Sequence, residues 1–245
     1  MQRIPEKERY FWFAFALALL SNQIPFQLAR PLARGKIHYD LSLSIDAAVP
    51  FLPWTVCIYA FAGLLFWFFL YRRVAALPRQ TADRFFCANL LGKGIAFLFF
   101  VFLPTEMTRP ELSDTGFWNT CMRLVYSVDE PNNLFPSLHC FIAWHCWVGL
   151  RGNKQVSPVW RVSALVMAVV VCISTLTTRE HVMVDVAAGI LLSELCWLLA
   201  GRDKLRGLYS SLAARVLLGK RKSRRPVPDE RMVFAAGRKH LGIYR

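Results

Sequence analysis

Two short stretches of the chain contain side chains that can do nucleophilic and acid–base chemistry. PNNLFPSLHCFIAW places Ser137 and His139 where an apolar helix is expected to begin, and EHVMVD has His181 and Asp185 four residues apart. On a helix that spacing puts both side chains on one face, so the carboxylate can accept a proton from one ring nitrogen. The other ring nitrogen is then free to attack. Taken alone, the pair is equally consistent with a structural hydrogen bond.

Three more polar residues are expected at the same membrane boundary as these motifs. Arg109 follows the third apolar run, and Ser174 and Arg179 follow the fifth. A guanidinium can bind two phosphate oxygens through parallel hydrogen bonds. The helix start at Ser137 adds unpaired N–H groups and the positive end of the helix dipole. Together these groups predict a phosphate-binding site.

The composition indicates a membrane protein. The chain has 245 residues, of which 55% are hydrophobic, and this is too apolar for an ordinary soluble domain. Runs long enough to cross the hydrocarbon layer, roughly 17 to 25 residues, lie at about 10–29, 53–71, 84–104, 135–150, 158–177 and 182–200. We therefore predict an all-α polytopic membrane protein, with six transmembrane helices in a bundle (residues 1–200) and a basic cytoplasmic tail (201–245).

The formal charge of +14 is unevenly distributed. Most Lys and Arg residues outside the apolar runs lie in the N-terminus, in the loops after the second and fourth runs, and in the tail. The positive-inside rule then places both termini in the cytoplasm. The predicted phosphate site would face the outer side of the cell membrane.

The tail is expected to contact anionic membrane lipids. Apolar residues recur at helical spacing beside basic ones, as in a helix that lies on a membrane surface: Leu205, Leu208, Leu212 and Val216. The KRKSRR run at 220–225 would contact anionic headgroups. It has no interleaved aromatic residues, so nucleic acid is not expected as a partner. The sequence leaves the oligomeric state open.

Several other polar residues are expected to have structural roles. The cysteines form no CxxC pair, which argues against a zinc site and a disulfide framework. Lys93 and Glu194 lie inside predicted spans and are expected to make a hydrogen bond or ion pair within the bundle. His145 is expected to make a buried hydrogen bond.

With these motifs, the sequence resembles the type-2 phosphatidic acid phosphatase superfamily. The signature of that family has three parts, an Arg-Pro, a Pro-Ser-x-His and a Ser-Arg followed by His-x-x-x-Asp. The corresponding residues here are Arg109-Pro110, Pro136-Ser137-Leu138-His139 and the closing His181 to Asp185. The resemblance covers about residues 40–195.

The chain departs from the family pattern at two positions. Phe102 replaces the usual Lys of the first motif, and Thr175 replaces the usual Arg of the third, while Arg179 lies two residues before His181. This pattern, together with DAAVPFLPWTVCIY at 46–59, resembles the branch that contains inositol phosphorylceramide synthase and bacterial relatives. Phosphate hydrolysis and phosphate transfer therefore both remain open.

The resemblance implies a role for each site residue. His181 would be the nucleophile, Asp185 its orienting partner and His139 the acid that protonates the leaving alcohol. The phosphate would be bound by Arg109, Arg179, Ser137 and Ser174. No metal or other cofactor is expected.

Three functions fit these residues. The first is hydrolysis of a lipid phosphate or diphosphate, such as phosphatidic acid, through a phosphohistidine. The second is transfer of a phosphate-containing headgroup to an alcohol acceptor. The third is a non-catalytic carrier or scaffold that only binds anions.

Overall fold

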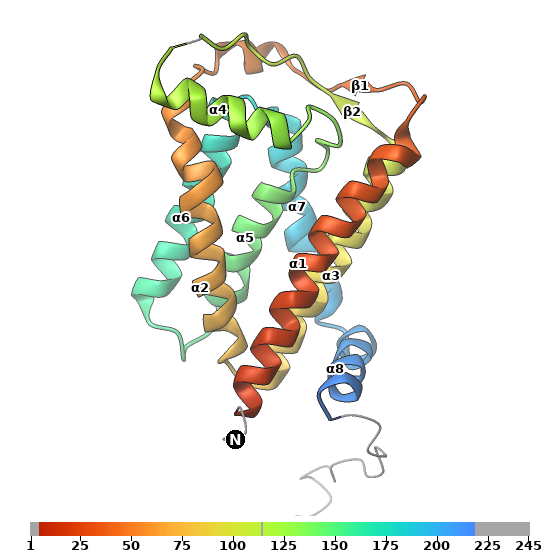
Figure 1. Ribbon diagram of the computed structural model, residues 1–245. Helices are drawn as coiled ribbons and strands as arrows, with labels where there is room; N and C mark the ends of the chain where they lie inside the picture. Colours follow the sequence, from red (N-terminus) through yellow and green to blue (C-terminus); the bar gives the residue numbers. More distant parts are fainter. Residues whose placement is uncertain (1–4, 114, 219–245) are drawn as a thin grey trace, which may run out of the picture.

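The chain folds as a bundle of helices, which confirms the predicted all-α class. The computed structural model describes residues 5–113 and 115–218. Long helices run side by side, and shorter segments connect them at the two ends of the bundle (Figure 1). In chain order the elements are α1 (Glu6–Ala33), β1 (Tyr39–Asp40), η1 (Ser44–Ala48), η2 (Pro53–Thr55), the π-helical η3 (Cys57–Ala62), α2 (Gly63–Ala75), α3 (Arg79–Phe102), β2 (Thr105–Glu106), α4 (Phe117–Val128), α5 (Leu138–Arg151), α6 (Pro158–Thr177), α7 (Met183–Ala200) and α8 (Asp203–Leu218).

Five of the six predicted spans correspond to segments long and apolar enough to cross a membrane. Within residues 5–113 and 115–218 these segments are α1, Pro53–Ala75, α3, α6 and α7. The predicted fourth span corresponds to α5, which has only 14 residues. Such a helix is about 21 Å long, shorter than the roughly 30 Å hydrocarbon layer. The number of six spans therefore stays a prediction.

Helix α5 is short because both of its ends are defined by local signals. Ser137 caps the start, since its hydroxyl accepts a hydrogen bond from the backbone N–H of Cys140, and the helix ends at Gly152. The helix packs against α3, α6 and α7, and most of its residues are buried. Its side chains are therefore enclosed by other helices, and its first turn lies inside one end of the bundle (Figure 1).

The long connection at 105–134 contains secondary structure that the sequence analysis did not predict. Helix α4 lies across the end of the bundle, and β2 pairs in parallel with β1 beside it (Figure 1). The helix is amphipathic, with Met122 buried and Phe117, Leu124 and Val128 exposed. The helix has only about three turns, so its pattern of apolar residues is short and difficult to recognise in the sequence of a long connection.

The motif-bearing ends of the helices meet at one end of the bundle. The C-termini of α3 and α6 and the N-termini of α5 and α7 all lie on the side of α4, whereas the start of α1 and helix α8 lie at the opposite end (Figure 1). The sequence predicted this shared boundary from the alternation of the spans.

The tail begins with the predicted surface helix, α8. Leu208, Leu212 and Val216 are 70%, 46% and 55% exposed, whereas Tyr209 and Ala213 are buried in the main core together with residues of α1 and α3. The exposed apolar stripe fits the expectation of a helix on a membrane surface. The KRKSRR run lies outside the described residues.

The polar residues inside the predicted spans, of which Lys93 and His145 are buried and Glu194 is partly exposed, have the structural partners expected of them. Lys93 Nζ donates to the carbonyl oxygen of Ala18 at 2.6 Å. Glu194 forms an ion pair with Arg151 at 2.6 Å. His145 is buried and hydrogen-bonds through both ring nitrogens, to the Phe85 carbonyl and the Ser193 hydroxyl. The predicted role of His145 is confirmed.

Candidate active site

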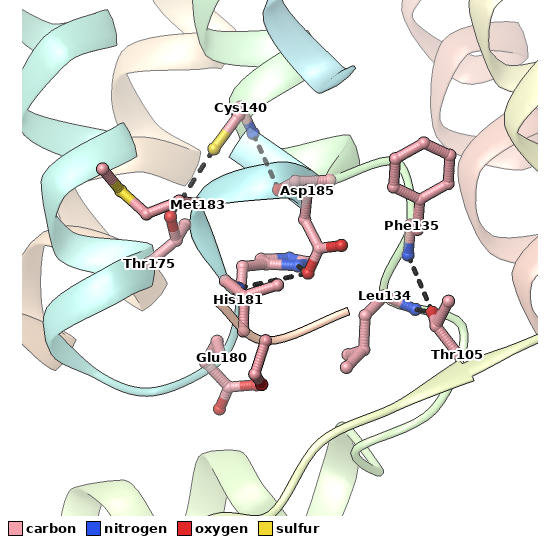
Figure 2. A network of polar contacts seen from close by, with 12 residues as sticks. Thr105, Leu134, Phe135, Cys140, Thr175, Glu180, His181, Met183 and Asp185 are labelled. Carbon is pink, nitrogen blue, oxygen red and sulfur yellow. Dashed lines mark hydrogen bonds and ion pairs between the residues drawn. The ribbon is translucent and has the colours of Figure 1, made fainter. Parts of the chain in front are cut away.

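His181 and Asp185 form the central pair of the site. His181 lies in the turn between α6 and α7, and its Nδ1 is 3.3 Å from Oδ2 of Asp185 (Figure 2). The same oxygen accepts the backbone N–H of Val182 at 3.2 Å, so the carboxylate also caps α7. Both side chains are buried. None of the described residues hydrogen-bonds to Nε2 of His181, so this nitrogen is available for a ligand.

The carboxylate also changes the basicity of His181. Burial alone would lower the pKa of the imidazole, because it disfavours the charged form. The hydrogen bond and the negative charge of Asp185 outweigh that effect, and the pKa of His181 is raised. The ring nitrogen opposite Asp185 is therefore a stronger base and a better nucleophile than that of an isolated buried histidine.

His139 lies in the first turn of α5 and faces His181. The centroids of the two rings are 5.9 Å apart. On its other side His139 contacts Tyr59 of η3, with 4.3 Å between the ring centroids, and the Tyr59 hydroxyl donates to Asp129 at 3.1 Å. None of the described residues hydrogen-bonds to the ring nitrogens of His139. The two imidazoles therefore have free nitrogens on facing elements.

The starts of α5 and α7 are joined at their backbones. The N–H of Ser137 donates to the carbonyl oxygen of Asp185 at 3.1 Å. This approach is possible because position 189 is glycine: a Cβ there would lie 2.5 Å from the Ser137 carbonyl oxygen and 3.2 Å from Cβ of Cys140. The hydroxyl of Ser137 is used as the helix cap described above. Ser137 therefore positions His139 relative to Asp185.

The loop that precedes α5 is fixed by a single hydroxyl. Thr105 of β2 accepts hydrogen bonds from the backbone N–H groups of Leu134 and Phe135, both at 3.0 Å (Figure 2). Because β2 is paired with β1, this contact connects the approach to the Pro-Ser-x-His motif with the connection at 34–52.

Arg109 lies at the site with its guanidinium already paired. It forms an ion pair with the buried Glu180, donates to the Asp129 carbonyl at 2.6 Å, and lies over the ring of Tyr126 with its Cζ 4.1 Å from the centroid. Burial raises the pKa of Glu180 to about 8, although the charge of Arg109 lowers it. Glu180 is a site residue that was not predicted, and its position between Arg179 and His181 was the one available signal.

Two of the predicted phosphate ligands have side chains that donate to backbone carbonyls. Arg179 has a φ of 55°, which turns the chain sharply after α6, and its guanidinium donates to the carbonyls of Asp46 and Val49 at 2.8 and 2.6 Å. Ser174 donates its hydroxyl to the Val171 carbonyl at 2.8 Å within α6. Both residues lie near the boundary that the sequence predicts. The direction of each side chain depends on the turn and on the rotation of the helix about its axis, and neither can be read from the distance of the residue to the motif in sequence.

Asp46 of η1 is a further structural residue of the site. Its carboxylate accepts the backbone N–H of Met183, the first residue of α7, at 2.8 Å, and the N–H of Leu43 at 2.7 Å. With its carbonyl bound by Arg179, Asp46 fixes the turn that carries His181. Asp46 belongs to the stretch at 46–59 that resembles the inositol phosphorylceramide synthase branch. Its contact with the start of α7 could not be predicted from the spacing of nearby residues.

A cavity of about 170 Å³ lies beside the two histidines. Its lining includes both rings, Glu180 and several amide side chains, namely Asn22, Gln23, Gln27, Asn132 and Asn133. Asn133 is buried, and neither polar atom of its amide has a hydrogen-bond partner within the described residues. Unpaired buried amides are costly, so their presence here indicates a polar ligand. These asparagines lie directly before the motif, which was the available sequence signal.

The described residues include no group of three or more His, Cys, Asp and Glu side chains arranged to hold a metal ion. The polar residues of the cavity are instead the two histidines, the carboxyl groups of Asp129 and Glu180, and the amides. They can supply a nucleophile, a proton and hydrogen bonds to an anion.

An all-α polytopic bundle with a His–Asp pair and a second histidine at one end defines a membrane protein suited to phosphoryl chemistry. The model of the PAP2 superfamily matches residues 36–199, and the chain belongs to this superfamily. Its members are typically phosphoesterases or phosphotransferases, which supports an enzyme of this type. No curated protein and no solved structure matches the chain significantly.

Proposed function

We propose that the protein is a lipid phosphatase that hydrolyses a lipid phosphate or diphosphate through a phosphohistidine, without a metal ion. The observation that carries the proposal is the geometry of His181. Its Nδ1 is bonded to Asp185, its Nε2 is unpartnered among the described residues, and the ring shares a cavity with His139.

The first half of the reaction forms the phosphoenzyme. Nε2 of His181 attacks phosphorus, a P–N bond forms, and the P–O bond to the lipid alcohol breaks with its electron pair on oxygen. His139 donates a proton to that oxygen, and the negative charge of the bound phosphate favours the protonated form of this buried imidazole. The positive charge that develops on the His181 ring is stabilised by Asp185.

The second half restores the enzyme. His139, now neutral, takes a proton from a water molecule, whose oxygen attacks phosphorus. The P–N bond breaks with its electron pair on Nε2, inorganic phosphate leaves, and His181 returns to its starting state.

Phosphate binding requires an exchange of partners at Arg109. The guanidinium is paired with Glu180, and a bound phosphate would compete for the same donors. Because burial raises the pKa of Glu180 to about 8, the carboxyl can be protonated near neutral pH. A neutral Glu180 would release Arg109 and would not repel the anion. The backbone N–H groups at the start of α5 and the free amide of Asn133 supply further hydrogen bonds.

Transfer to an alcohol acceptor is the second candidate. Apolar side chains of α1, α3 and α5 line the same cavity, among them Phe26, Phe100 and Leu138. They offer a surface to an alcohol that carries a hydrocarbon chain, in place of water. A synthase of the inositol phosphorylceramide type would attack a phosphodiester with the same histidine. Its intermediate would keep the headgroup alcohol on phosphorus, and an acceptor alcohol would take the place of water.

The proposed setting is the cell membrane, with both termini in the cytoplasm and the site at the outer side. The basic N-terminus, the basic loops and α8 all belong to the end of the bundle opposite the histidines (Figure 1). The positive-inside rule supports this orientation.

The test is phosphate release from phosphatidic acid by purified protein in detergent micelles that contain a metal chelator. Wild-type protein is expected to release phosphate, and His181→Ala to release none. His38→Ala is the matched control, because His38 is only partly buried and, within the described residues, its ring hydrogen-bonds only to the Lys36 carbonyl. Full release by the His181 variant would refute the mechanism.

A substrate with a radioactive phosphate distinguishes hydrolysis from transfer. Label in inorganic phosphate indicates hydrolysis, and label in a new lipid after addition of an alcohol acceptor indicates transfer. A trapped phosphoenzyme that is acid-labile and base-stable supports phosphohistidine. If no lipid phosphate gives either product, the protein is a non-catalytic anion binder.

A further inference from the structure

A second cavity lies at the end of the bundle opposite the histidines. Its volume is about 530 Å³, which is within the range of small-molecule sites, roughly 300–1,000 Å³. It is formed where the start of α3, the ends of α5 and α7, the α5–α6 loop and α8 meet (Figure 1). Neither histidine of the candidate active site contributes to its lining.

Four cationic side chains from separate elements line this cavity: Arg84 of α3, Arg151 of α5, Lys154 of the α5–α6 loop and Arg206 of α8. No carboxylate belongs to its lining. Neutral groups that can donate hydrogen bonds complete the wall, namely Gln80, Thr81 and Asn153. The lining therefore has the composition of an anion site.

The partners of these cations leave a net positive charge. Arg151 is paired with Glu194, and Arg206 with Asp203, whose side chain is 90% exposed. Arg84 donates only to the neutral carbonyl oxygen of Trp197, at 2.9 and 3.1 Å, and lies over the Trp197 ring. Within residues 5–113 and 115–218, the Lys154 ammonium has no hydrogen bond or ion pair. Two of the four charges are therefore not balanced by a described carboxylate.

The start of α3 adds to the attraction. Helix α3 begins at Arg79, and Gln80 and Thr81 of its first turn line the cavity. The N–H of Thr81 already donates to the Pro78 carbonyl at 2.9 Å, but the first turn as a whole carries the positive end of the helix dipole. Planar guanidinium groups beside such a helix start are suited to phosphate oxygens.

We propose that this cavity binds a phosphate group, either in the headgroup of an anionic phospholipid or as a soluble phosphate. Arg84 and Lys154 bind the phosphate oxygens, and the rim formed by Arg151 and Arg206 provides the surrounding positive field. The site is distinct from the candidate active site and does not rest on the proposed function. It also differs from the predicted lipid contact of the tail, because it is a cavity formed by five elements and not a basic run.

Two binding measurements on the full chain separate the two sources of phosphate. In the first, the melting temperature of detergent-purified protein is followed as inorganic phosphate replaces chloride at constant ionic strength, since a ligand of the folded state raises it. In the second, native mass spectrometry counts the lipids retained after incubation with phosphatidylglycerol or, as the zwitterionic comparison, phosphatidylcholine.

The diagnostic variant is Lys154→Gln, which removes a charge that supports no described contact. The matched control is Lys204→Gln, because Lys204 is exposed in α8 and does not line the cavity. His181→Ala serves as a second control, because it alters the other site and should leave this binding intact.

We expect Lys154→Gln to weaken binding by about tenfold, the effect of one charged hydrogen bond, while both controls bind like wild type. A loss confined to phosphatidylglycerol identifies a lipid headgroup, and a loss in the inorganic phosphate series identifies a soluble ligand. If Lys154→Gln binds both ligands like wild type, or if Lys204→Gln loses as much, the proposal is wrong.

Discussion

Replacing Gly189 by Ala tests whether the close contact of α5 and α7 positions the two histidines. The added Cβ would lie 2.5 Å from the Ser137 carbonyl oxygen and 3.1 Å from the Phe141 nitrogen. Both are backbone atoms of α5, so no side chain can rotate away. The start of α5 must move relative to α7, which bears Asp185.

The size of the movement follows from these distances. A carbon atom normally approaches a carbonyl oxygen to about 3.3 Å, so the helices must separate by roughly 0.8 Å. The hydrogen bond from Ser137 to the Asp185 carbonyl, now 3.1 Å, would lengthen to about 4 Å and be lost. Overpacking of this kind costs about 1–3 kcal/mol, and a misplacement of about 1 Å can lower the rate about 100-fold.

The assay measures kcat/KM for phosphate release together with the melting temperature. Gly189→Ala is expected to lower kcat/KM by about 100-fold and to lower the melting temperature moderately. Gly94→Ala is the matched control, because Gly94 lies inside α3 and a Cβ there meets nothing within 4 Å. It should retain full activity and melt at the same or a higher temperature, since Ala is the better helix former.

One result would refute this reasoning. If Gly189→Ala keeps wild-type kcat/KM and melting temperature, the approach of α5 to α7 does not set the geometry of the site. A fall in both variants would instead indicate a general sensitivity of helix packing.

Three further substitutions address single contacts at the site. Asp185→Asn should lower kcat by about 100- to 10,000-fold. Because Asp185 raises the pKa of His181, the acidic limb of the kcat/KM profile should also move to lower pH in this variant. An unmoved limb would contradict the coupling between the two residues. For wild type, kcat/KM should fall as pH rises through about 8, where Glu180 ionises beside the phosphate. Glu180→Gln should remove this limb, and its persistence would assign it to another group. Asn133→Ala should raise KM about three- to tenfold with little change in kcat; an unchanged KM would exclude the amide as a ligand.

The fold was largely predictable because hydrophobic length and charge act locally along the chain. Apolar runs predicted the five helices long enough to cross a membrane. Helix α5 matches the short run predicted at about 135–150; it is as apolar as a span, but it is short and packs among neighbouring helices. Helix α4 was missed because its short amphipathic period lies inside a loop rich in polar residues.

The site was predictable only in part. The spacing of His181 and Asp185 predicted their hydrogen bond, because the two residues are only four positions apart, on either side of the start of α7. Glu180 as the partner of Arg109 could not be predicted, because this contact joins residues 71 positions apart. The same holds for Arg179, whose positive φ turns the chain and whose guanidinium donates to the carbonyls of Asp46 and Val49.

The sequence by itself determined the class of the protein, the boundary at which its polar motifs meet, and the residue types available for phosphoryl chemistry. These follow from periodicity, hydrophobic length and intrinsic side-chain chemistry, which belong to the chain before it folds. Only the tertiary structure decided which nitrogens are free, which cations already have partners, and that a second basic cavity exists at the other end of the bundle. Those properties depend on distances between elements far apart in sequence, and packing alone sets such distances.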